Sequence, residues 1–217
     1  NNFILFEGAQ GSLLDRDFGT YPFVTSSNTS SGQIFSGTGF GIKEKHNVLG
    51  ITKAYTTRVG SGPFVTELDN ETGDHFVEKG QEFGTVTKRK RRCGWFDAAL
   101  VRQSIAINGI TDVVLTKLDV LDELKDIQVC VGYEAKDKQY NYLPFDENIH
   151  NSLVPIYETI PGWQESTFGL TTWDDLPKKA QNYINFLESK IEKNISIIST
   201  GPDRAHTIDR NNLLGNN

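Results

Sequence analysis

The chain has 217 residues and a formal net charge of −6 at pH 7, with 37% hydrophobic and 23% charged residues. This composition is typical of folded globular proteins, and the negative charge argues against a general nucleic-acid or membrane-surface binder. No apolar run reaches the ~18 residues that span a bilayer, and two cysteines, Cys93 and Cys130, favour reduced core thiols of a cytosolic protein over a disulfide framework.

Three short apolar runs predict buried strands, and each is followed at once by a polar or glycine-bearing turn. The runs are residues 3–6, 113–115 and 195–198, and the turns are residues 7–11, 116–119 and 199–202. In an open parallel sheet, ligands bind beyond the carboxyl ends of the strands. The sequence therefore predicts an α/β fold with a central, mostly parallel sheet, flanking helices and a site shared by these turns.

Two segments predict helices. The first runs from about Trp95 to Ile107 and is expected to stop at Asn108-Gly109. The second begins after a cap at Asp174 or Asp175, with Pro177 in its first turn. Its apolar residues fall on one face, and its charged residues are expected in solvent. The apolar set is Ala180, Tyr183, Ile184, Leu187 and Ile191, and the charged set is Lys178, Lys179, Glu188 and Lys190.

Further strands are predicted where β-branched and aromatic residues gather. One covers residues 48–59 and ends at Gly60. Residues 127–133 and 139–143 flank Lys136-Asp137-Lys138 and predict a hairpin. The glycine-rich stretch 37–41 is interpreted as a loop, because its G-x-G-x-G spacing is not a dinucleotide fingerprint. The four histidines lack metal-ligand spacing, so no metal site is predicted.

The turn after the second strand is similar to the N/T-K-x-D motif with which GTP-binding proteins recognise guanine. Its residues are Thr116, Lys117, Leu118 and Asp119. A carboxylate presents two acceptors to the N1 and N2 donors of guanine, whereas adenine has no such donor pair. The lysine stem can cover the base plane. Four residues are a weak signal, and a helix N-cap with a solvated lysine is the alternative.

Five consecutive cations run from Lys88 to Arg92, and the rest of the chain carries a formal charge of −11. A solvated or nuclear-localisation-like loop, a nucleic-acid patch and a loop that closes on a small polyanion are the three hypotheses. Neighbours that look packed, such as Phe83 and Trp95, disfavour the first, and no interleaved aromatics support the second. Arginine forks bind carboxylate and phosphate oxygens bidentately, which favours the third.

The first predicted strand leads into Glu7-Gly8-Ala9-Gln10-Gly11. Its glycines let the backbone approach a ligand closely. Gln10 offers a donor and an acceptor, which suits a purine edge. An ordinary strand-to-helix turn is the alternative.

Together these segments resemble adenylosuccinate synthetases, in order and over nearly the whole chain. The matching blocks are residues 6–11, 19–29, 57–64, 88–95, 116–122, 155–163 and 199–204. So many ordered blocks are far more specific than any single motif. The resemblance implies a P-loop-NTPase-like α/β fold in which residues 1–217 are the C-terminal portion of a single domain. The sheet is then expected to be incomplete, because the N-terminal half is absent.

The resemblance also implies an enzyme. Such a ligase uses GTP to join IMP and L-aspartate into adenylosuccinate, through a 6-phosphoryl-IMP intermediate, in the first committed step of AMP synthesis. Mg²⁺ is the implied cofactor, with its ligands in the N-terminal half. A cytoplasmic homodimer is implied, with IMP, GTP and aspartate as ligands and neither nucleic acid nor membrane as a partner.

By the same resemblance, individual residues receive expected roles. The IMP-binding residues are Gln10, Thr25, Val59 and Arg89. The loop that closes on aspartate comprises Thr85, Val86, Thr87, Lys88, Arg89, Lys90 and Arg91. The GTP-binding residues are Arg91, Lys117, Leu118, Asp119, Ser199, Thr200 and Gly201.

The sequence departs from the family pattern in two ways. The family's loop reads Thr-Thr-Gly-Arg-Arg-Arg-Arg, so Val86 lacks a hydroxyl that would bind aspartate, and Lys88 in place of glycine stiffens the loop. The family's phosphate loop, catalytic Asp and His, and cross-dimer Arg lie in the N-terminal half. No catalytic residue is therefore expected here beyond a supporting Gln10, and we expect the chain alone to be inactive. A non-catalytic purine-nucleotide-binding module is the alternative.

Overall fold

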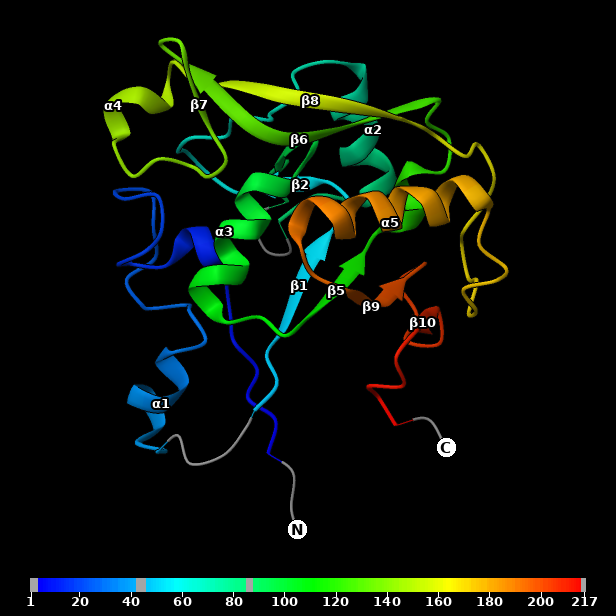
Figure 1. Cartoon of the computed structure of the whole chain (residues 1–217), viewed down its shortest axis with the longest axis horizontal. Helices are drawn as coiled ribbons and strands as arrows, with labels where there is room; N and C mark the ends of the chain where they lie inside the picture. Colours follow the sequence, from blue (N-terminus) through cyan, green and yellow to red (C-terminus); the bar gives the residue numbers. More distant parts are fainter. Residues whose placement is uncertain (1–3, 42–45, 85–87, 216–217) are drawn as a thin grey trace.

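The computed structural model describes residues 4–41, 46–84 and 88–215 (Figure 1). Its central sheet has the order β1 (Leu49–Lys53), β5 (Asp112–Thr116), β9 (Ile195–Ser199) and β10 (Thr207–Asp209). The pairs β1–β5 and β5–β9 are parallel, and β10 runs antiparallel to β9. The predicted mostly parallel α/β sheet is confirmed, as are the strands expected at residues 113–115 and 195–198.

Helices α3 (Ala98–Asn108) and α5 (Lys178–Ile191) lie between the central sheet and a second sheet (Figure 1). The predicted apolar face of α5 is confirmed, because all five of its residues are buried. The hydroxyl of Tyr183 on this face donates to the Ala54 carbonyl at 2.9 Å. Helix α5 thereby closes the core over the carboxyl end of β1.

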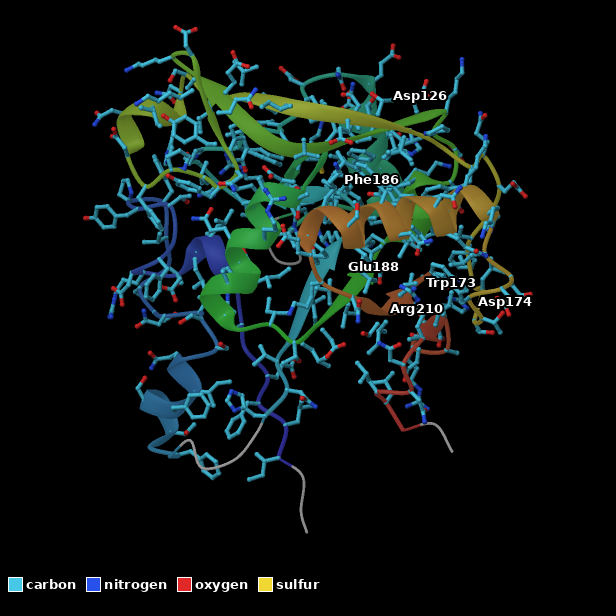
Figure 2. The ribbon with its side chains drawn as sticks, in the orientation of Figure 1. Asp126, Trp173, Asp174, Phe186, Glu188 and Arg210 are labelled. Atoms are coloured by element: carbon cyan, nitrogen blue, oxygen red, sulfur yellow. The ribbon has the colours of Figure 1, made fainter. Side chains whose placement is uncertain are left out.

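Two details of α5 differ from expectation. Neither predicted aspartate caps it: Pro177 occupies the N-cap position, and Asp175 instead accepts from the Thr172 hydroxyl. Glu188 and Lys190 are not left to solvent. Glu188 accepts from Arg210 Nη1 at 2.7 Å and from the Ile195 amide, and Lys190 donates to Glu158 Oε1 at 2.6 Å. The Arg210 guanidinium also stacks on the Trp173 ring, with its carbon 4.0 Å from the ring centroid (Figure 2). These contacts anchor the chain after β10.

The second sheet is organised around the long strand β6 (Asp126–Ala135). It pairs parallel with β4 (Phe96–Asp97) and antiparallel with β7 (Lys138–Tyr140) and β8 (Val154–Pro161). The predicted hairpin is confirmed, although its second strand ends at Tyr140 and not at residue 143. Lys136 and Asp137 have φ values of 51° and 62°, as a tight two-residue turn between twisted strands requires.

The single strand predicted over residues 48–59 is wrong. The segment contains β1, a turn at Ala54-Tyr55, and β2 (Thr56–Arg58), which pairs with β3 (Arg92–Gly94) outside the central sheet. Ala54 and Tyr55 are both buried, with exposures of 1% and 2%. Consecutive residues of one strand point to opposite faces, so this pair marks the point where the chain leaves the central sheet.

The strand expected at residues 3–6 is also wrong. Ile4, Leu5 and Phe6 are not in a strand, and they are 64%, 89% and 39% exposed, whereas Phe3 lies outside the described residues. No described strand pairs with this run, so its backbone groups have no sheet partner and are left to water. Its hydrophobicity alone therefore does not make a strand.

Two other boundaries shift. Helix α3 starts at Ala98 and not at Trp95, because Phe96 and Asp97 pair with β6 and the Asp97 carboxylate caps the helix through the Leu100 amide at 3.0 Å. The helix ends at Asn108, and Gly109 terminates it with a left-handed φ of 59°, as predicted. The stretch at residues 37–41 is expected to be a loop, but its first two residues belong to helix α1 (Gln33–Thr38). Gly39 terminates this helix at φ 69°.

The remaining elements are η1 (Ser12–Leu14), α2 (Glu71–Gly80), η2 (Leu118–Leu121) and α4 (Glu147–His150). Cys93 and Cys130 are buried and free, as expected. In the described ranges, no helix combines the length and apolarity that crossing a bilayer requires.

Candidate functional site

The expected guanine-reading residues lie at the carboxyl edge of the central sheet, where β5 ends. Lys117 takes a left-handed φ of 64°, and its ammonium group donates to the Gly80 carbonyl of α2 at 2.9 Å. The Leu118 side chain is fully buried, so only its backbone can face a ligand. In the described structure, Asp119 Oδ1 is buried and has no hydrogen-bond partner. Burying an acceptor without a hydrogen bond lowers the stability of the folded chain unless a donor, for example from a ligand, reaches it.

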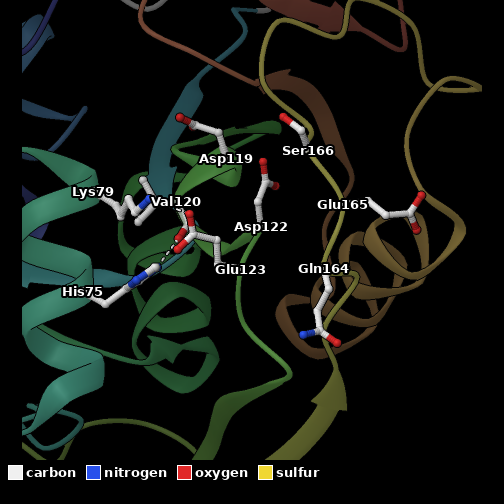
Figure 3. A pocket seen from close by; sticks show the side chains of 9 residues that line it. All are labelled: His75, Lys79, Asp119, Val120, Asp122, Glu123, Gln164, Glu165 and Ser166. Atoms are coloured by element: carbon white, nitrogen blue, oxygen red, sulfur yellow. Dashed lines mark hydrogen bonds and ion pairs between the residues drawn. The ribbon is translucent and has the colours of Figure 1, made fainter.

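Asp119 belongs to a pocket of about 440 Å³ (Figure 3). The pocket is lined by His75, Lys79, Asp119, Val120, Asp122, Glu123, Gln164, Glu165 and Ser166. Burial raises the pKa of both Asp119 and Asp122. Both carboxylate oxygens of Asp122 already accept hydrogen bonds, from Trp163 Nε1 at 2.7 Å and from the amide and hydroxyl of Thr167. Asp119 therefore retains the acceptor capacity that a base with two N–H donors needs.

The turn after β9 has a tightly fixed backbone. Thr200 is fully buried, and its hydroxyl donates to the Leu170 carbonyl at 2.7 Å, so this side chain is structural. The Ser199 hydroxyl donates to the Gly201 carbonyl at 2.9 Å. A Cβ at Gly201 would lie 2.5 Å from His206 Nδ1, so any larger residue there would require the His206 ring to shift. Sequence reasoning gave His206 no role, because its packing against Gly201 follows from a turn that spacing alone does not reveal.

The cationic run is not an uncompensated patch. Three of its five members pair with acidic side chains of the same chain. The pairs are Lys90 with Asp74, Arg91 with Glu82, and Arg92 with Glu67. Lys88 is exposed at φ 52°, a left-handed conformation that glycine, the residue of the family pattern, adopts without cost. Thr85, Val86 and Thr87 lie outside the described residues.

Glu82 is a site residue that sequence reasoning missed. Its side chain is 2% exposed and accepts from Lys53, Tyr55 and Arg91 at 2.7, 2.6 and 2.9 Å. No local motif marks it, because its three partners lie 29, 27 and 9 residues away in the sequence.

The loop that carries Thr25 is organised around one buried carboxylate. Asp15 accepts from the amides of Asp17, Phe18, Thr29 and Ser30. Burial alone would raise the pKa of Asp15, but these backbone hydrogen bonds outweigh it and lower the pKa to about 2. The Thr25 amide closes the same loop by donating to the Leu14 carbonyl at 2.8 Å.

The β2–β3 pair connects this loop to the cationic run. Arg58 Nη2 donates to the Thr20 hydroxyl at 2.8 Å and to the Phe23 carbonyl at 3.1 Å. Across the pair, Arg92 stands opposite Arg58, and its Nη1 donates to the carbonyls of Gly60 and Gly62. The segments that carry Thr25 and Val59 are thus tied to the segment that carries Arg91.

The structure brings some of the expected site residues together and leaves others apart. Lys117 and Arg91 approach the same end of α2, and Asp119 lines the adjoining pocket. Gln10 is exposed at φ 62°, in a segment tied by Ser12 to Asn108 at the end of α3, and it does not line that pocket. Arg89 is exposed and does not line it either.

The open, mostly parallel sheet with a pocket at its carboxyl edge is an α/β fold of the kind that binds ligands beyond the ends of its strands. Residues 1–208 match the family model described as adenylosuccinate synthetase, and the chain belongs to this family of ligases.

Curated relatives support the same assignment. Adenylosuccinate synthetase of Coxiella burnetii (strain Dugway 5J108-111) is 57% identical over 97% of this chain and 48% of its own length. The Methylobacillus flagellatus protein is 57% identical over 94% of this chain and 48% of its own length. A structure of fully ligated adenylosuccinate synthetase from Plasmodium falciparum superimposes with a TM-score of 0.90 at 43% identity, over 94% of this chain and 49% of that one. The chain thus spans about half the length of these relatives.

Proposed function

We propose that residues 1–217 are the C-terminal portion of a single adenylosuccinate synthetase domain. The whole protein would catalyse the GTP-dependent ligation of IMP and L-aspartate to adenylosuccinate, the first committed step of AMP synthesis. The proposal rests on membership of the family and on one observation of the site: the unpaired, buried Asp119 Oδ1 beside Lys117 at the carboxyl edge of the sheet.

In the proposed reaction, the γ-phosphoryl group of GTP passes to O6 of IMP, and the aspartate amine then displaces that phosphate. Asp119 would accept from N1 and N2 of guanine, with Lys117 against the base and Ser199 to Gly201 framing it. Arg91 would bind GTP. Fixed cations stabilise the charge that develops during phosphoryl transfer, and they do so without reorganisation at the moment of reaction.

The loop at residues 85–91 would bind the two carboxylates of aspartate. Gln10, Thr25, Val59 and Arg89 would bind IMP. The tie between the Thr25 loop and the cationic run through Arg58 and Arg92 supports a common site for the two groups.

Mg²⁺ is implied by the family. Within the described ranges, no group of three or more His, Cys, Asp or Glu side chains could hold a metal ion. These residues therefore assign no Mg²⁺ site, and the proposal takes no step through the ion. We further propose that the whole protein is a cytoplasmic homodimer.

The direct test is turnover by the full-length gene product. We expect formation of adenylosuccinate, followed by the absorbance change of the purine, to require GTP, IMP and aspartate together. Replacing GTP with ATP is the matched control and should abolish turnover. A full-length protein without GTP-dependent turnover would contradict the proposal.

The alternative of a non-catalytic nucleotide-binding module applies to the chain alone. Calorimetry with GDP and with IMP separates the two cases. Measurable binding of either nucleotide by the 217-residue chain, without turnover, supports an independent binding module. Absent or millimolar binding indicates that the pockets need further polypeptide.

A further inference from the structure

The C-terminal end of α2 gathers cations from three other parts of the chain. The helix ends at Gly80, Gln81 takes a left-handed φ of 51°, and Glu82 follows. The carbonyl groups of a last helical turn carry partial negative charge and attract cations. Lys117 donates to one of them, that of Gly80, at 2.9 Å. Lys53, at the end of β1, and Arg91, just before β3, reach the same place through Glu82.

Both oxygens of the Glu82 carboxylate are in use. Oε1 accepts from Lys53 Nζ at 2.7 Å and from the Tyr55 hydroxyl at 2.6 Å, and Oε2 accepts from Arg91 Nη1 at 2.9 Å. Burial alone would raise the pKa of Glu82, but the hydrogen bonds from its three partners outweigh it, and the net shift is downward. Glu82 is therefore ionised at neutral pH and holds two cations in fixed positions.

The Glu82 backbone strengthens this arrangement. Its carbonyl accepts from the Arg91 amide at 2.9 Å, so Arg91 is fixed by main chain and side chain together. Lys53 has a second partner, the Thr57 hydroxyl, at 2.9 Å. A Cβ at Gly80 would lie 2.1 Å from the Tyr55 hydroxyl, so glycine is needed there for Tyr55 to reach Glu82.

The charges at this point do not balance. Three cations, Lys53, Arg91 and Lys117, gather against two carboxylates, Glu82 and Asp119. Burial lowers the pKa of Lys53, which its hydrogen bond with Glu82 opposes. In the described structure, Arg91 Nε is buried without a hydrogen-bond partner. An excess of positive charge with an unused guanidinium donor fits an anion with several oxygens. The adjoining Lys117 and Asp119 suit a guanine base, so the matching anion is the phosphate chain of the same nucleotide.

We propose that Glu82 is a positioning residue for nucleotide binding, which holds Lys53 and Arg91 at the end of α2 so that their charges face the phosphates of the nucleotide read by Lys117 and Asp119. This inference rests on the proposed function. Glu82 touches no substrate; it acts through the cations that it orients. Lys53 thereby joins the phosphate-binding set, although no sequence motif marks it.

The test is Glu82→Gln in the full-length protein, with steady-state kinetics for each substrate. We expect the KM for GTP to rise about tenfold, because loss of one charge-assisted anchor corresponds to about 1.4 kcal/mol. The KM for IMP should change less than about twofold. Glu158→Gln is the matched control, since it removes a carboxylate of β8 that pairs with Lys190 of α5 and leaves the site intact.

A second variant keeps the test decisive if Glu82→Gln fails to fold. Tyr55→Phe removes one donor to Oε1 but leaves the Glu82 charge and its bond to Lys53 in place. It should raise the KM for GTP about two- to threefold and spare the KM for IMP.

Three outcomes are distinguishable. An unchanged KM for GTP in both variants, with an active wild type, overturns the positioning role. An equal rise of every KM together with a large fall in Tm also overturns it, because it indicates a general structural role. An inactive wild type overturns the proposed function itself.

Discussion

Three aspartates show how environment assigns different tasks to one side chain. Four backbone amides lower the pKa of Asp15 to about 2, and this carboxylate anchors a loop. Burial raises the pKa of Asp97 to about 6, against opposing hydrogen bonds from Tyr133 and two amides. Burial also raises the pKa of Asp119, whose Oδ1 remains unpaired in the described structure. Only the last has the character expected of a group that binds a ligand.

Asp119→Asn should change which purine base is preferred. Xanthine carries a carbonyl oxygen where guanine carries its N2 amino group, so an amide side chain with one donor and one acceptor matches it better. We expect the full-length variant to lose at least about tenfold in kcat/KM with GTP and to gain activity with XTP.

The control for this exchange is Glu123→Gln, which neutralises an exposed carboxylate of the same pocket. It should leave the preference for GTP unchanged. If Asp119→Asn used GTP as well as the wild type does, Asp119 would not recognise guanine.

Asp97 should make stability depend on pH. The folded state holds the Asp97 proton up to about pH 6, whereas the unfolded state releases it near 3.8. The stabilisation is therefore complete below pH 3.8 and is lost as the pH rises through 6.

Asp97→Asn should remove this dependence. Asparagine caps a helix as well as aspartate does and still accepts from Tyr133, so its fold should persist. Between pH 4 and pH 7, the stability of the wild type relative to the variant should fall by roughly 2–3 kcal/mol. Urea unfolding at several pH values measures it, and parallel pH profiles of the two proteins would refute the assignment.

At the scale of elements, the β2–β3 pair connects the loop that carries Thr25 to the segment that carries Arg91. Its strands are short, yet they carry Arg58 and Arg92 opposite each other and fix both flanking loops. Gly94 permits this close packing, because a Cβ there would lie 2.1 Å from the Thr66 carbonyl oxygen. The neighbouring Trp95 amide donates to that same oxygen at 3.1 Å.

Gly94→Ala should therefore destabilise the chain by about 2 kcal/mol, because the clash is with backbone that cannot move aside. Gly8→Ala is the matched control, since a Cβ at Gly8 meets nothing within 4 Å. Chemical unfolding of both variants gives the comparison. Equal stabilities would show that residues 66 and 94 are less tightly packed than the structure indicates.

At the scale of the whole molecule, apolar side chains remain exposed around β1. Ile51 is 75% exposed and Leu49 42%, and β1 is an edge strand of the described sheet. The first segment also leaves an apolar side chain in solvent, because Leu5 is 89% exposed. Exposed apolar surface next to an open strand edge favours association with other polypeptide.

We expect the 217-residue chain to self-associate as its concentration rises. Ile51→Lys should reduce the association, because it places a charge on the edge strand. Phe145→Lys is the control, since Phe145 is 68% exposed but follows β7 of the second sheet, just before α4. Sedimentation velocity over a concentration series measures this, and a chain that stays monomeric throughout would contradict the prediction.

The sequence by itself determined the elements whose signal is contiguous. The apolar runs of β5 and β9, the face of α5 and the turn at Lys136-Asp137 follow from periodicities of two or 3.6 residues that each segment carries alone. The motif of Lys117 and Asp119 was visible in the sequence because its residues are nearly adjacent. At residues 4–6, hydrophobicity predicted a strand, but no described strand pairs with this segment and the strand does not form.

Only the tertiary structure decided how distant charges pair. It joined Lys53, Glu82 and Lys117 at the end of α2, and it divided the cationic run between internal acidic partners and the site. It also bent the chain at Ala54-Tyr55 into two sheets. These outcomes depend on which segments meet in space, and a buried charge selects its partner by distance and desolvation, neither of which is encoded in the spacing of residues along the chain.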